Sequence, residues 1–329
     1  MITARLEAML KRWRDNYYAS LLLSSIARPV HFVCSRVASQ LQRKVRKNGV
    51  TIRLPNGKDL RFARDAGVGL ASLLFWNGID GFEPETSKAL RALFERAETF
   101  VDVGANYGIY SILGGVWNPA LRVIAFEPLT AIYEGLKKNV RCNRLEERIV
   151  CENLALASAG GAATFFIPNT EDKDLESTGT LATESWQARK GSPQVQVETV
   201  RFDDYERKHP IRVDLVKIDV EDFEAAVLTG MQGVIRRDLP FIVCEILPRK
   251  HHNQGTHDIV KALNYQPYWI TPLGCIRVFH FDFERKDCNN FLLSPVSTPE
   301  VVVSDLGGLW NLRQQALRTQ PDRFVHPPS

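Results

Sequence analysis

Short apolar runs alternate with helical segments through the middle of the chain. The segments 107–117, 129–143 and 223–236 predict helices. The apolar runs predict buried strands: TFVDV (99–103), LRVIAFE (121–127), RIVCENLAL (148–156), VDLVKIDV (213–220) and PFIVCEIL (240–247). Because strands that alternate with helices of this length are joined by right-handed crossovers, the pattern predicts an α/β fold with a mostly parallel sheet.

The flanking segments predict a hairpin, a helix and further strands. VTIRLP and KDLRFA surround Asn56-Gly57, the dipeptide best able to hold positive φ at both centres of a tight turn. This predicts a hairpin over 50–63, and apolar residues at helical spacing predict a helix over 83–98. The last third predicts one helix and three strand-like pieces at 265–270, 275–281 and 289–295.

An insertion at 160–212 interrupts the alternation. GGAATFFIP and VQVETV predict two short strands within it, and the polar stretch between them predicts a mobile loop. A long insertion at this position projects from the sheet edge that carries the ligand. We therefore divide the chain into a basic helical N-terminal arm (1–49), a hairpin and helix leading into the core (50–98), a main domain with the insertion (99–295), and a C-terminal tail (296–329).

Composition is ordinary for a globular protein, since 44% of the 329 residues are hydrophobic and 24% are charged. This excludes a disordered or fibrous chain. No run reaches the roughly 18 apolar residues that a membrane-spanning helix needs. The six cysteines are scattered, with no C-x-x-C pair and no metal-binding spacing. With no secretory signal at the start, we expect a cytoplasmic protein without a metal site.

Charge is distributed unevenly along the chain. Residues 1–47 hold ten basic and two acidic side chains, so this arm carries +8 and the remainder carries −4 of the overall +4. Two interpretations are open: helices that pack on the main domain, or an amphipathic arm that contacts an anionic inner membrane surface. The net acidic remainder and the lack of an Asn-Pro-Pro-aromatic motif argue against a nucleic-acid partner.

Two motifs at successive predicted strand ends indicate a ligand that contains a ribose. The segment DVGANYG (102–108) follows a strand and opens a helix, so Gly104 allows close backbone approach and the helix N-terminus offers unpaired N–H groups. Glu127 closes the next strand, 23 residues after Gly104. An acid at this position accepts hydrogen bonds from both hydroxyls of a ribose.

The absence of two nucleotide-binding motifs narrows the chemical class of the ligand further. The dinucleotide fingerprint is absent because Asp102 stands two positions before Gly104, where the fingerprint has its first glycine. There is no Walker lysine either. A carboxylate at position 102 is unsuited to a pyrophosphate and suited to a cation. A ligand with a ribose, a positive charge and no phosphates is S-adenosylmethionine.

At this point the sequence resembles the FkbM-type S-adenosylmethionine-dependent methyltransferases. The resemblance covers about residues 75–295. One departure is Asp222, where the family usually has glycine after KIDVE; an aspartate tolerates a left-handed backbone or caps a helix. The motifs that carry the resemblance are FVDVGANYGIYS (100–111), VIAFEP (123–128), NLALA (153–157), VDLVKIDVEDFEAAVLTG (213–230) and FIVCEI (241–246), with GFEPET (81–86) and NNFLLSP (289–295) also similar.

The resemblance implies a Rossmann-like class I methyltransferase fold. This fold has a seven-stranded, mostly parallel sheet with helices on both faces, and the cofactor S-adenosylmethionine lies across the C-terminal strand ends. Glu83 precedes the first core strand, where it either folds over the cofactor or lies at the start of a helix. The other implied cofactor-binding residues are Asp102, Gly104 and Asn106 for the methionine portion, Glu127 for the ribose, and Asn153 and Ala155 for the adenine.

Methyl transfer to a hydroxyl requires a base that removes the hydroxyl proton. The resemblance implies that the segment 219–221 lines the methyl-transfer site. Glu221 is therefore the first candidate for the base, with Asp219 and His251 as further candidates. Glu245, at the end of the next strand, is another. The alternative for Asp219 is a helix cap, and the alternative for His251 is a solvated loop residue.

The acceptor class also comes from the resemblance. It implies an O-methyltransferase that acts on a hydroxyl of a glycan, a lipid-linked sugar or a secondary metabolite; neither the acceptor itself nor the oligomeric state can be read from the sequence. One alternative is an NAD(P)-dependent oxidoreductase or epimerase, for which Tyr133 and Lys137 have the Tyr-x-x-x-Lys spacing but lie on the helix after the second strand. Another is a non-catalytic binding module on the same fold.

Overall fold

The computed structural model describes residues 48–168, 179–182, 191–247, 253–281, 289–298, 300 and 302–319. The predicted helices of the arm at 1–47, the loop between the insertion strands (apart from 179–182) and His251 lie outside these residues. In the described ranges, no helix has the length and apolar character needed to cross a bilayer.

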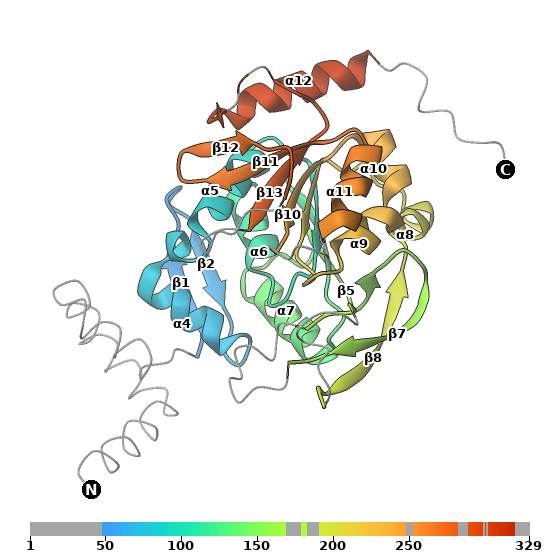
Figure 1. Ribbon diagram of the computed structural model, residues 1–329. Coiled ribbons are helices and arrows are strands. Elements are labelled where there is room, and N and C mark those ends of the chain that lie inside the picture. The colour runs from blue at the N-terminus through green and yellow to red at the C-terminus, as the bar shows by residue number, and fades with distance from the viewer. Residues whose placement is uncertain are drawn as a thin grey trace, which may run out of the picture.

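A mixed sheet forms the centre of the molecule (Figure 1). Five neighbouring strands are parallel, and β13 runs antiparallel between β10 and β11. In spatial order the strands are β5 (Ile149–Glu152), β4 (Arg122–Phe126), β3 (Thr99–Val103), β9 (Leu215–Ile218), β10 (Phe241–Glu245), β13 (Asn290–Ser294), β11 (Gln266–Thr271), β12 (Gly274–Arg277) and β14 (Val302–Val303). The predicted α/β fold with a largely parallel sheet is confirmed.

The described sheet is nine strands wide, two more than the seven that the resemblance implied. The seven strands from β5 to β11 correspond to the expected ones. The sheet is wider because the chain turns back after Thr271, so that β12 pairs with β11, and β14 then pairs with β12. Both added strands are short and lie at one edge, far along the sheet from β3 and β4.

Helices cover both faces of the sheet, as expected. Side chains alternate between two hydrophobic clusters along the central strands; Leu215 faces one cluster and Val216 the other. One cluster contains residues of α5 (Pro84–Phe94), α6 (Ile109–Trp117), α7 (Thr130–Cys142) and α12 (Leu306–Arg318). The other contains residues of α8 (Phe202–Lys208), α9 (Glu224–Gly230), α10 (Gln232–Asp238) and α11 (Asn253–Ala262).

The predicted hairpin over 50–63 is present as β1 (Val50–Arg53) and β2 (Asp59–Phe62). Its turn differs from the expectation, because Gly57 has positive φ and Asn56 does not. The backbone N–H of Gly57 donates to the carbonyl of Leu54, so the loop is longer than a two-residue turn. The elements that follow, α4 (Val68–Asn77) and the short 3-10 helix η1 (Ile79–Gly81), were not predicted from the sequence.

The predicted strands of the insertion are present. β7 (Gly161–Phe166) and β8 (Gln194–Val200) pair antiparallel, and β6 (Ala155–Leu156) pairs with β8 in parallel. They form a second, three-stranded sheet. The single helix predicted over 223–236 is wrong, because the chain forms α9 and α10, separated at Met231. A Cβ on Gly230, the last residue of α9, would lie 2.0 Å from the carbonyl oxygen of Ala157, so this helix end is pressed against the chain after β6.

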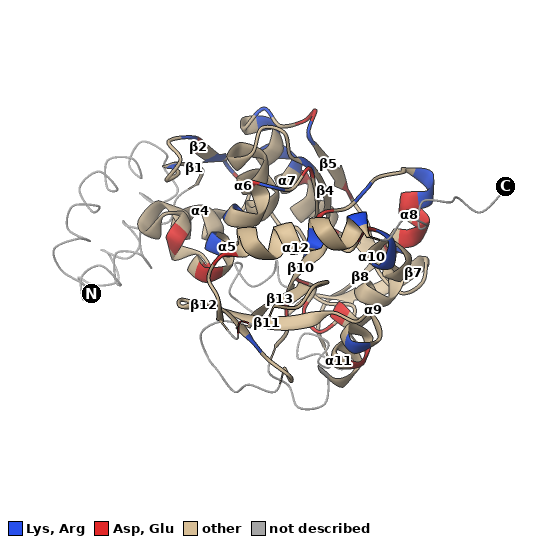
Figure 2. Ribbon diagram, turned by 90° about the horizontal axis from the view of Figure 1, so that it is seen from above, with Lys and Arg blue, Asp and Glu red and all other residues tan. Residues whose placement is uncertain are grey.

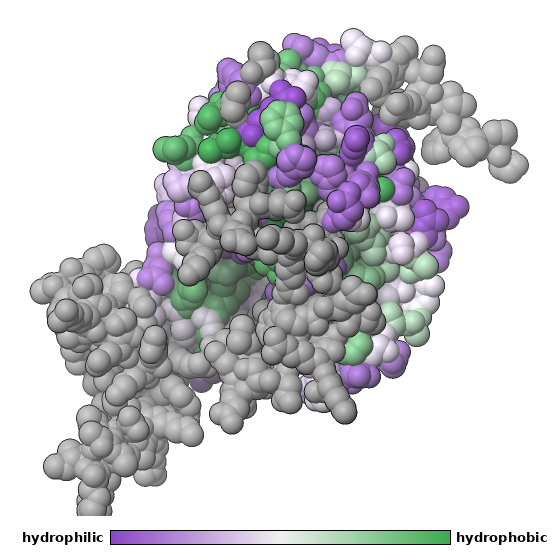
Figure 3. All heavy atoms as spheres, in the orientation of Figure 1, coloured by the Kyte–Doolittle hydropathy of each residue, from purple (hydrophilic) through white to green (hydrophobic). Residues whose placement is uncertain are grey.

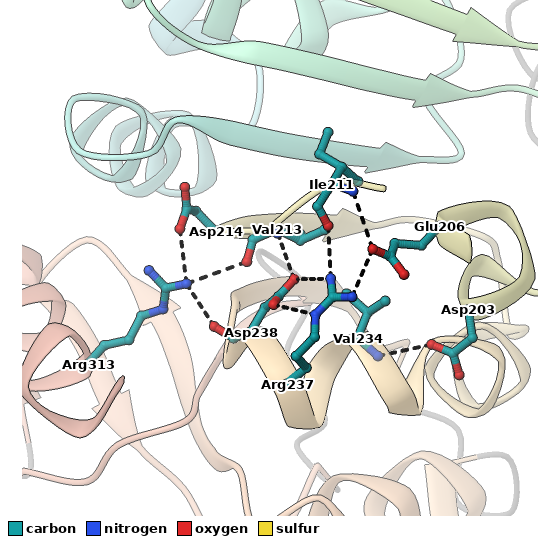
Figure 4. A network of polar contacts seen from close by, with 9 residues as sticks. All are labelled: Asp203, Glu206, Ile211, Val213, Asp214, Val234, Arg237, Asp238 and Arg313. Atoms are coloured by element: carbon teal, nitrogen blue, oxygen red, sulfur yellow. Dashed lines mark hydrogen bonds and ion pairs between the residues drawn. The ribbon is translucent and has the colours of Figure 1, made fainter. Parts of the chain in front are cut away.

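Helix α12 is another unpredicted element, and a buried arginine fixes it to the sheet. The Arg313 side chain is 0% exposed. It donates to the carbonyl oxygen of Asp238 at 2.9 Å and to the Asp214 carboxylate at 3.1 Å (Figure 4). It also donates to the carbonyl oxygen of Leu239 at 2.6 Å. The other oxygen of Asp214 accepts the backbone N–H of Thr99 at 3.3 Å. Arg313 therefore connects α12 to the start of β3.

A second set of ion pairs lies beside this one. Arg237 of α10 contacts Asp238 and Glu206, both at 2.8 Å, and Asp203 accepts the backbone N–H groups of Gly233 and Val234 at 3.0 Å. In Figure 2, the acidic positions of α8 and the basic positions of α10 lie side by side. These contacts hold the helices at the amino-terminal edge of the sheet, away from the strand ends that carry the predicted motifs.

We predict that Arg313→Ala lowers the free energy of unfolding by about 3–5 kcal/mol, because it leaves the Asp214 carboxylate buried without its cation. Urea denaturation at pH 7 measures the change. Arg318→Ala, on the exposed end of the same helix, is the matched control and should change the free energy by less than about 0.5 kcal/mol. Equal effects of the two substitutions would contradict the assignment.

Candidate active site

The carboxyl ends of β3, β4, β9 and β10 border a cavity of about 1470 Å³. In an open α/β sheet, ligands bind outside these strand ends. The cavity wall includes residues of these four strand ends, residues just before α5, and residues of the insertion. Of the residues predicted from the sequence, it contains Glu83, Asp102, Gly104, Asn106, Glu127, Ala155, Asp219, Glu221 and Glu245.

Gly104 lies where two strand ends touch. Its φ is 75°, and a Cβ at this position would lie 1.9 Å from the backbone oxygen of Asp219. The N–H groups of Gly104 and Ala105 donate to the carbonyl of Phe126 at 3.1 and 2.9 Å. Glycine is therefore required at this position for the contact between the ends of β3 and β9. The sequence had suggested another reason for the glycine, close approach of the backbone to a ligand.

Glu127 is buried at the end of β4, with 5% of its surface exposed. One carboxylate oxygen accepts the backbone N–H of Asn106 and the other that of Leu129, both at 2.9 Å. Each oxygen keeps a further lone pair. Burial raises the pKa of Glu127 to about 7, although both hydrogen bonds act in the opposite direction. The carboxylate is thus held rigidly and faces the cavity with acceptor capacity for two hydroxyls.

Asp102 and Lys217 are neighbours in the register of β3 and β9 and lie on the same face of the sheet. The Asp102 side chain is 2% exposed and accepts the hydroxyl of Ser111 at 2.5 Å. Burial raises the pKa of Asp102 to about 6, while Ser111 and the Lys217 ammonium lower it. From the sequence, Lys217 was predicted only to be part of a strand.

Lys217 is 0% exposed and interacts electrostatically with three carboxyl groups, those of Asp219, Glu83 and Glu245. Its ammonium is 3.2 Å from Asp219 and 5.7 Å from the centre of the Tyr110 ring. Burial alone would lower the pKa of Lys217, but Asp219, Glu83 and Glu245 outweigh it and raise the pKa. The lysine stays charged. The sequence signal that could have identified it is a lysine inside the apolar run LVKI.

Asp219 and Glu245 end adjacent strands, and their carboxyl groups share a hydrogen bond. Burial acts to raise the pKa of Asp219, but Lys217 and the hydrogen bond lower it below its usual range. The charge of Asp219, together with burial, raises the pKa of Glu245. Lys217 thus favours the charged form of Asp219, and this adjacent negative charge favours the neutral form of Glu245.

Glu83 lies on the wall of the same cavity. It precedes Pro84, the first residue of α5, with φ 39°, and makes no side-chain cap hydrogen bond to that helix. Its carboxylate instead accepts the Tyr110 hydroxyl at 2.6 Å and the Asn290 amide at 3.1 Å. The negative charge of Glu83 contributes to the raised pKa of Lys217. The residue is thus fixed beside the strand ends by α6 and β13.

Glu221 and Asp222 form a left-handed turn after β9, with φ of 53° and 74°. Two consecutive non-glycine residues in this region are uncommon, and aspartate at 222 supplies the conformation for which glycine was expected. The buried Thr180 from the insertion donates its hydroxyl to the backbone carbonyl of Glu221. The insertion therefore reaches the cavity wall, as its place in the sequence predicted.

Asn153 and Ala155 follow β5, and they differ in placement. Ala155 contributes to the cavity wall, whereas Asn153 is not among the residues that line it. The Asn153 amide donates to the carbonyls of Glu127 and Pro128, both at 2.9 Å. Asn153 thus supports the turn that carries Glu127. His251 lies outside the described residues.

The cavity residues fit a cofactor with hydroxyl groups and positive charge. Glu127 offers free acceptor sites, Asp102 and Asp219 supply negative charge nearby, and the volume exceeds the roughly 300–1,000 Å³ of a pocket for one small ligand. Across the ranges that the structure describes, no group of three or more His, Cys, Asp or Glu side chains is arranged to hold a metal ion.

Comparison with known proteins identifies relatives of this chain. The model of the methyltransferase FkbM domain matches residues 102–268. Methyltransferase sdnD of Sordaria araneosa is 29% identical over 153 residues, which are 40% of this chain and 59% of that protein. The chain thus spans somewhat over half the length of this curated relative.

Solved structures with a similar fold are more distant in sequence. Methyltransferase FkbM from Methylobacillus flagellatus KT has a TM-score of 0.40 and 16% identity, over 71% of this chain and 56% of that chain. An S-adenosylmethionine-dependent methyltransferase from Agrobacterium tumefaciens has a TM-score of 0.41 and 10% identity, over 76% of this chain and 71% of that chain.

We predict that S-adenosylhomocysteine binds about tenfold more tightly at pH 8 than at pH 6, because the ionised Glu127, with a pKa of about 7, is the form that accepts hydroxyl hydrogen bonds. Glu127→Gln keeps the size of the side chain but cannot ionise, so its affinity should be weaker at pH 8 and flat with pH. Isothermal calorimetry at pH 6, 7 and 8 measures both proteins. The same pH profile in both would contradict the role of Glu127.

Proposed function

The chain belongs to the FkbM methyltransferase family, and we propose that it is an S-adenosylmethionine-dependent O-methyltransferase. We propose as its acceptor a hydroxyl of a glycan, a lipid-linked sugar or a secondary metabolite. The observation that carries this proposal is that the family-matched segment places Glu127, Asp219 and Glu221 on the wall of one cavity at the strand ends.

S-adenosylmethionine, when bound, supplies a methyl group on a positively charged sulfonium. In the proposal Glu127 holds the ribose hydroxyls with the acceptor sites that its backbone hydrogen bonds leave open. Asp102 near the end of β3 and Asn106 on the loop that follows contact the methionine portion in this proposal. Ala155 borders the adenine, and Asn153 acts indirectly by holding the turn at Glu127. The cofactor-binding residues thus come from three successive strand ends.

Glu221 is the proposed base for the acceptor hydroxyl. It lines the cavity two residues after Asp219, on a turn fixed by Thr180. Asp219 is a weaker proton acceptor because Lys217 lowers its pKa and stabilises its charge. The proton therefore passes from the acceptor hydroxyl to Glu221, while Asp219 orients the acceptor and provides the negative charge that favours a cationic ligand.

We predict that Glu221→Gln lowers kcat by about 100-fold or more, because an amide cannot take the hydroxyl proton. The measurement is release of S-adenosylhomocysteine with a panel of monosaccharides, alkyl glycosides and hydroxylated polyketides, followed by kinetics on the first acceptor that turns over. Binding of S-adenosylhomocysteine should be unchanged.

The matched control is Glu198→Gln, on an exposed position of β8 away from the cavity. It makes the same chemical change and should leave kcat unchanged. Turnover of Glu221→Gln at the rate of the unsubstituted protein would remove Glu221 from the mechanism and leave Asp219 as the next residue to substitute.

A further inference from the structure

Helix α4 belongs to the cavity but not to the family-matched segment. The family model begins at residue 102, whereas α4 spans Val68–Asn77. Its sequence, VGLASLLFWN, contains no charged side chain. Several of its residues line the cavity that also contains Gly104 and Glu127. This chain therefore adds a wholly uncharged helix to the wall of the proposed cofactor site.

The helix is apolar on more than one face. Ala71 and Leu74 are buried in the cluster beside α5 and α6. Leu70 and Leu73, three positions apart and so on one face, are half-buried and line the cavity. A surface helix normally presents polar side chains opposite its buried face. Here the cavity-facing positions are leucines instead.

Hydrogen bonds from α7 hold the start of α4 in place. The side chain of the fully buried Asn139 accepts the N–H of Ala63 at 2.8 Å and donates to the carbonyls of Ala66 at 3.3 Å and Tyr107 at 2.8 Å. A Cβ on Gly67 would lie 2.8 Å from the Tyr107 ring. The leucines of α4 thus have a defined position next to the loop that follows β3.

The size and surface of the cavity suit a second, apolar occupant. Its volume of about 1470 Å³ is above the range that serves one small ligand. Figure 3 shows hydrophobic side chains gathered in a hollow next to the position of α4 in Figure 1. Phe82 and Phe223 add aromatic rings to the wall, and Glu83 and Glu221 add carboxylates. The wall therefore offers both apolar and acidic surface.

We propose that the methyl acceptor is an amphiphile, with a hydroxyl-bearing polar head at the carboxylates and an apolar chain or ring system along Leu70 and Leu73. The proposal rests on the proposed function, since it assigns the acceptor of the same site. Carboxylates accept hydrogen bonds from hydroxyls, and burial of an apolar tail against leucine is favourable in proportion to the area removed from water. A simple sugar would leave the α4 surface exposed to water.

The test uses the full-length protein saturated with S-adenosylhomocysteine. n-Dodecyl β-D-maltoside, below its critical micelle concentration, and maltose are each titrated by isothermal calorimetry. They share a head group and differ in the tail. We expect one-to-one binding of the dodecyl glycoside, roughly tenfold or more tighter than maltose. Leu73→Asp should weaken the dodecyl glycoside roughly tenfold, and Leu73→Ala, a milder change, several-fold.

The matched control is Leu273→Asp, in the turn between β11 and β12, where the leucine is 79% exposed. It places the same charge on a surface leucine outside the cavity and should leave binding unchanged. The proposal is overturned if both glycosides bind equally, if neither Leu73 variant weakens the dodecyl glycoside, or if Leu273→Asp weakens it as much. In each of these cases S-adenosylhomocysteine still binds. A chain that does not bind S-adenosylhomocysteine at all contradicts the proposed function itself.

Discussion

One buried ammonium group, that of Lys217, makes the acidic strand ends physically possible. Four carboxyl groups near the strand ends are linked to this lysine or to one another by their effects on pKa values: Asp102, Asp219, Glu245 and Glu83. Uncompensated carboxylates in such a place would repel one another and take up protons. The buried, charged Lys217 favours the ionised form of Asp219. The charge of Asp219 in turn favours the neutral form of Glu245, so negative charge is favoured at the end of β9.

The backbone contacts around Gly104 determine the geometry of the rest of the candidate site. Because position 104 has no side chain, the loop after β3 touches the Asp219 carbonyl and binds the Phe126 carbonyl. This brings the Asn106 N–H to Glu127. Glu127, the proposed ribose ligand, and the acidic residues after β9, on the proposed acceptor side, therefore border one cavity although they are far apart in sequence. This arrangement supports the proposed methyl transfer, and α4 adds an apolar wall that the family-matched segment does not contain.

The core strands and the glycine turn could be predicted because they depend on local patterns. Apolar runs, the DVGANYG segment and the acid at 127 are visible in sequence, and their placement in the cavity follows from parallel strand ends. The role of Lys217 and the hydrogen bond that Glu83 accepts from Tyr110 could not be predicted, because they depend on contacts between residues far apart in sequence. Helix α12 was missed because Arg313, its anchor, looks like a surface residue in sequence. Asn153 looked like a ligand residue, yet its amide binds the Glu127 turn.

The most direct test of the account is a crystal structure of the protein with S-adenosylhomocysteine. The account predicts that the ribose hydroxyls lie within hydrogen-bond distance of both Glu127 oxygens, about 2.5–3.0 Å, with the homocysteine portion beside the loop at Gly104. It also predicts that the sulfur faces the part of the cavity bordered by Asp219 and Glu221. Binding at another surface, or a cavity that accepts NAD and not S-adenosylhomocysteine, would contradict it.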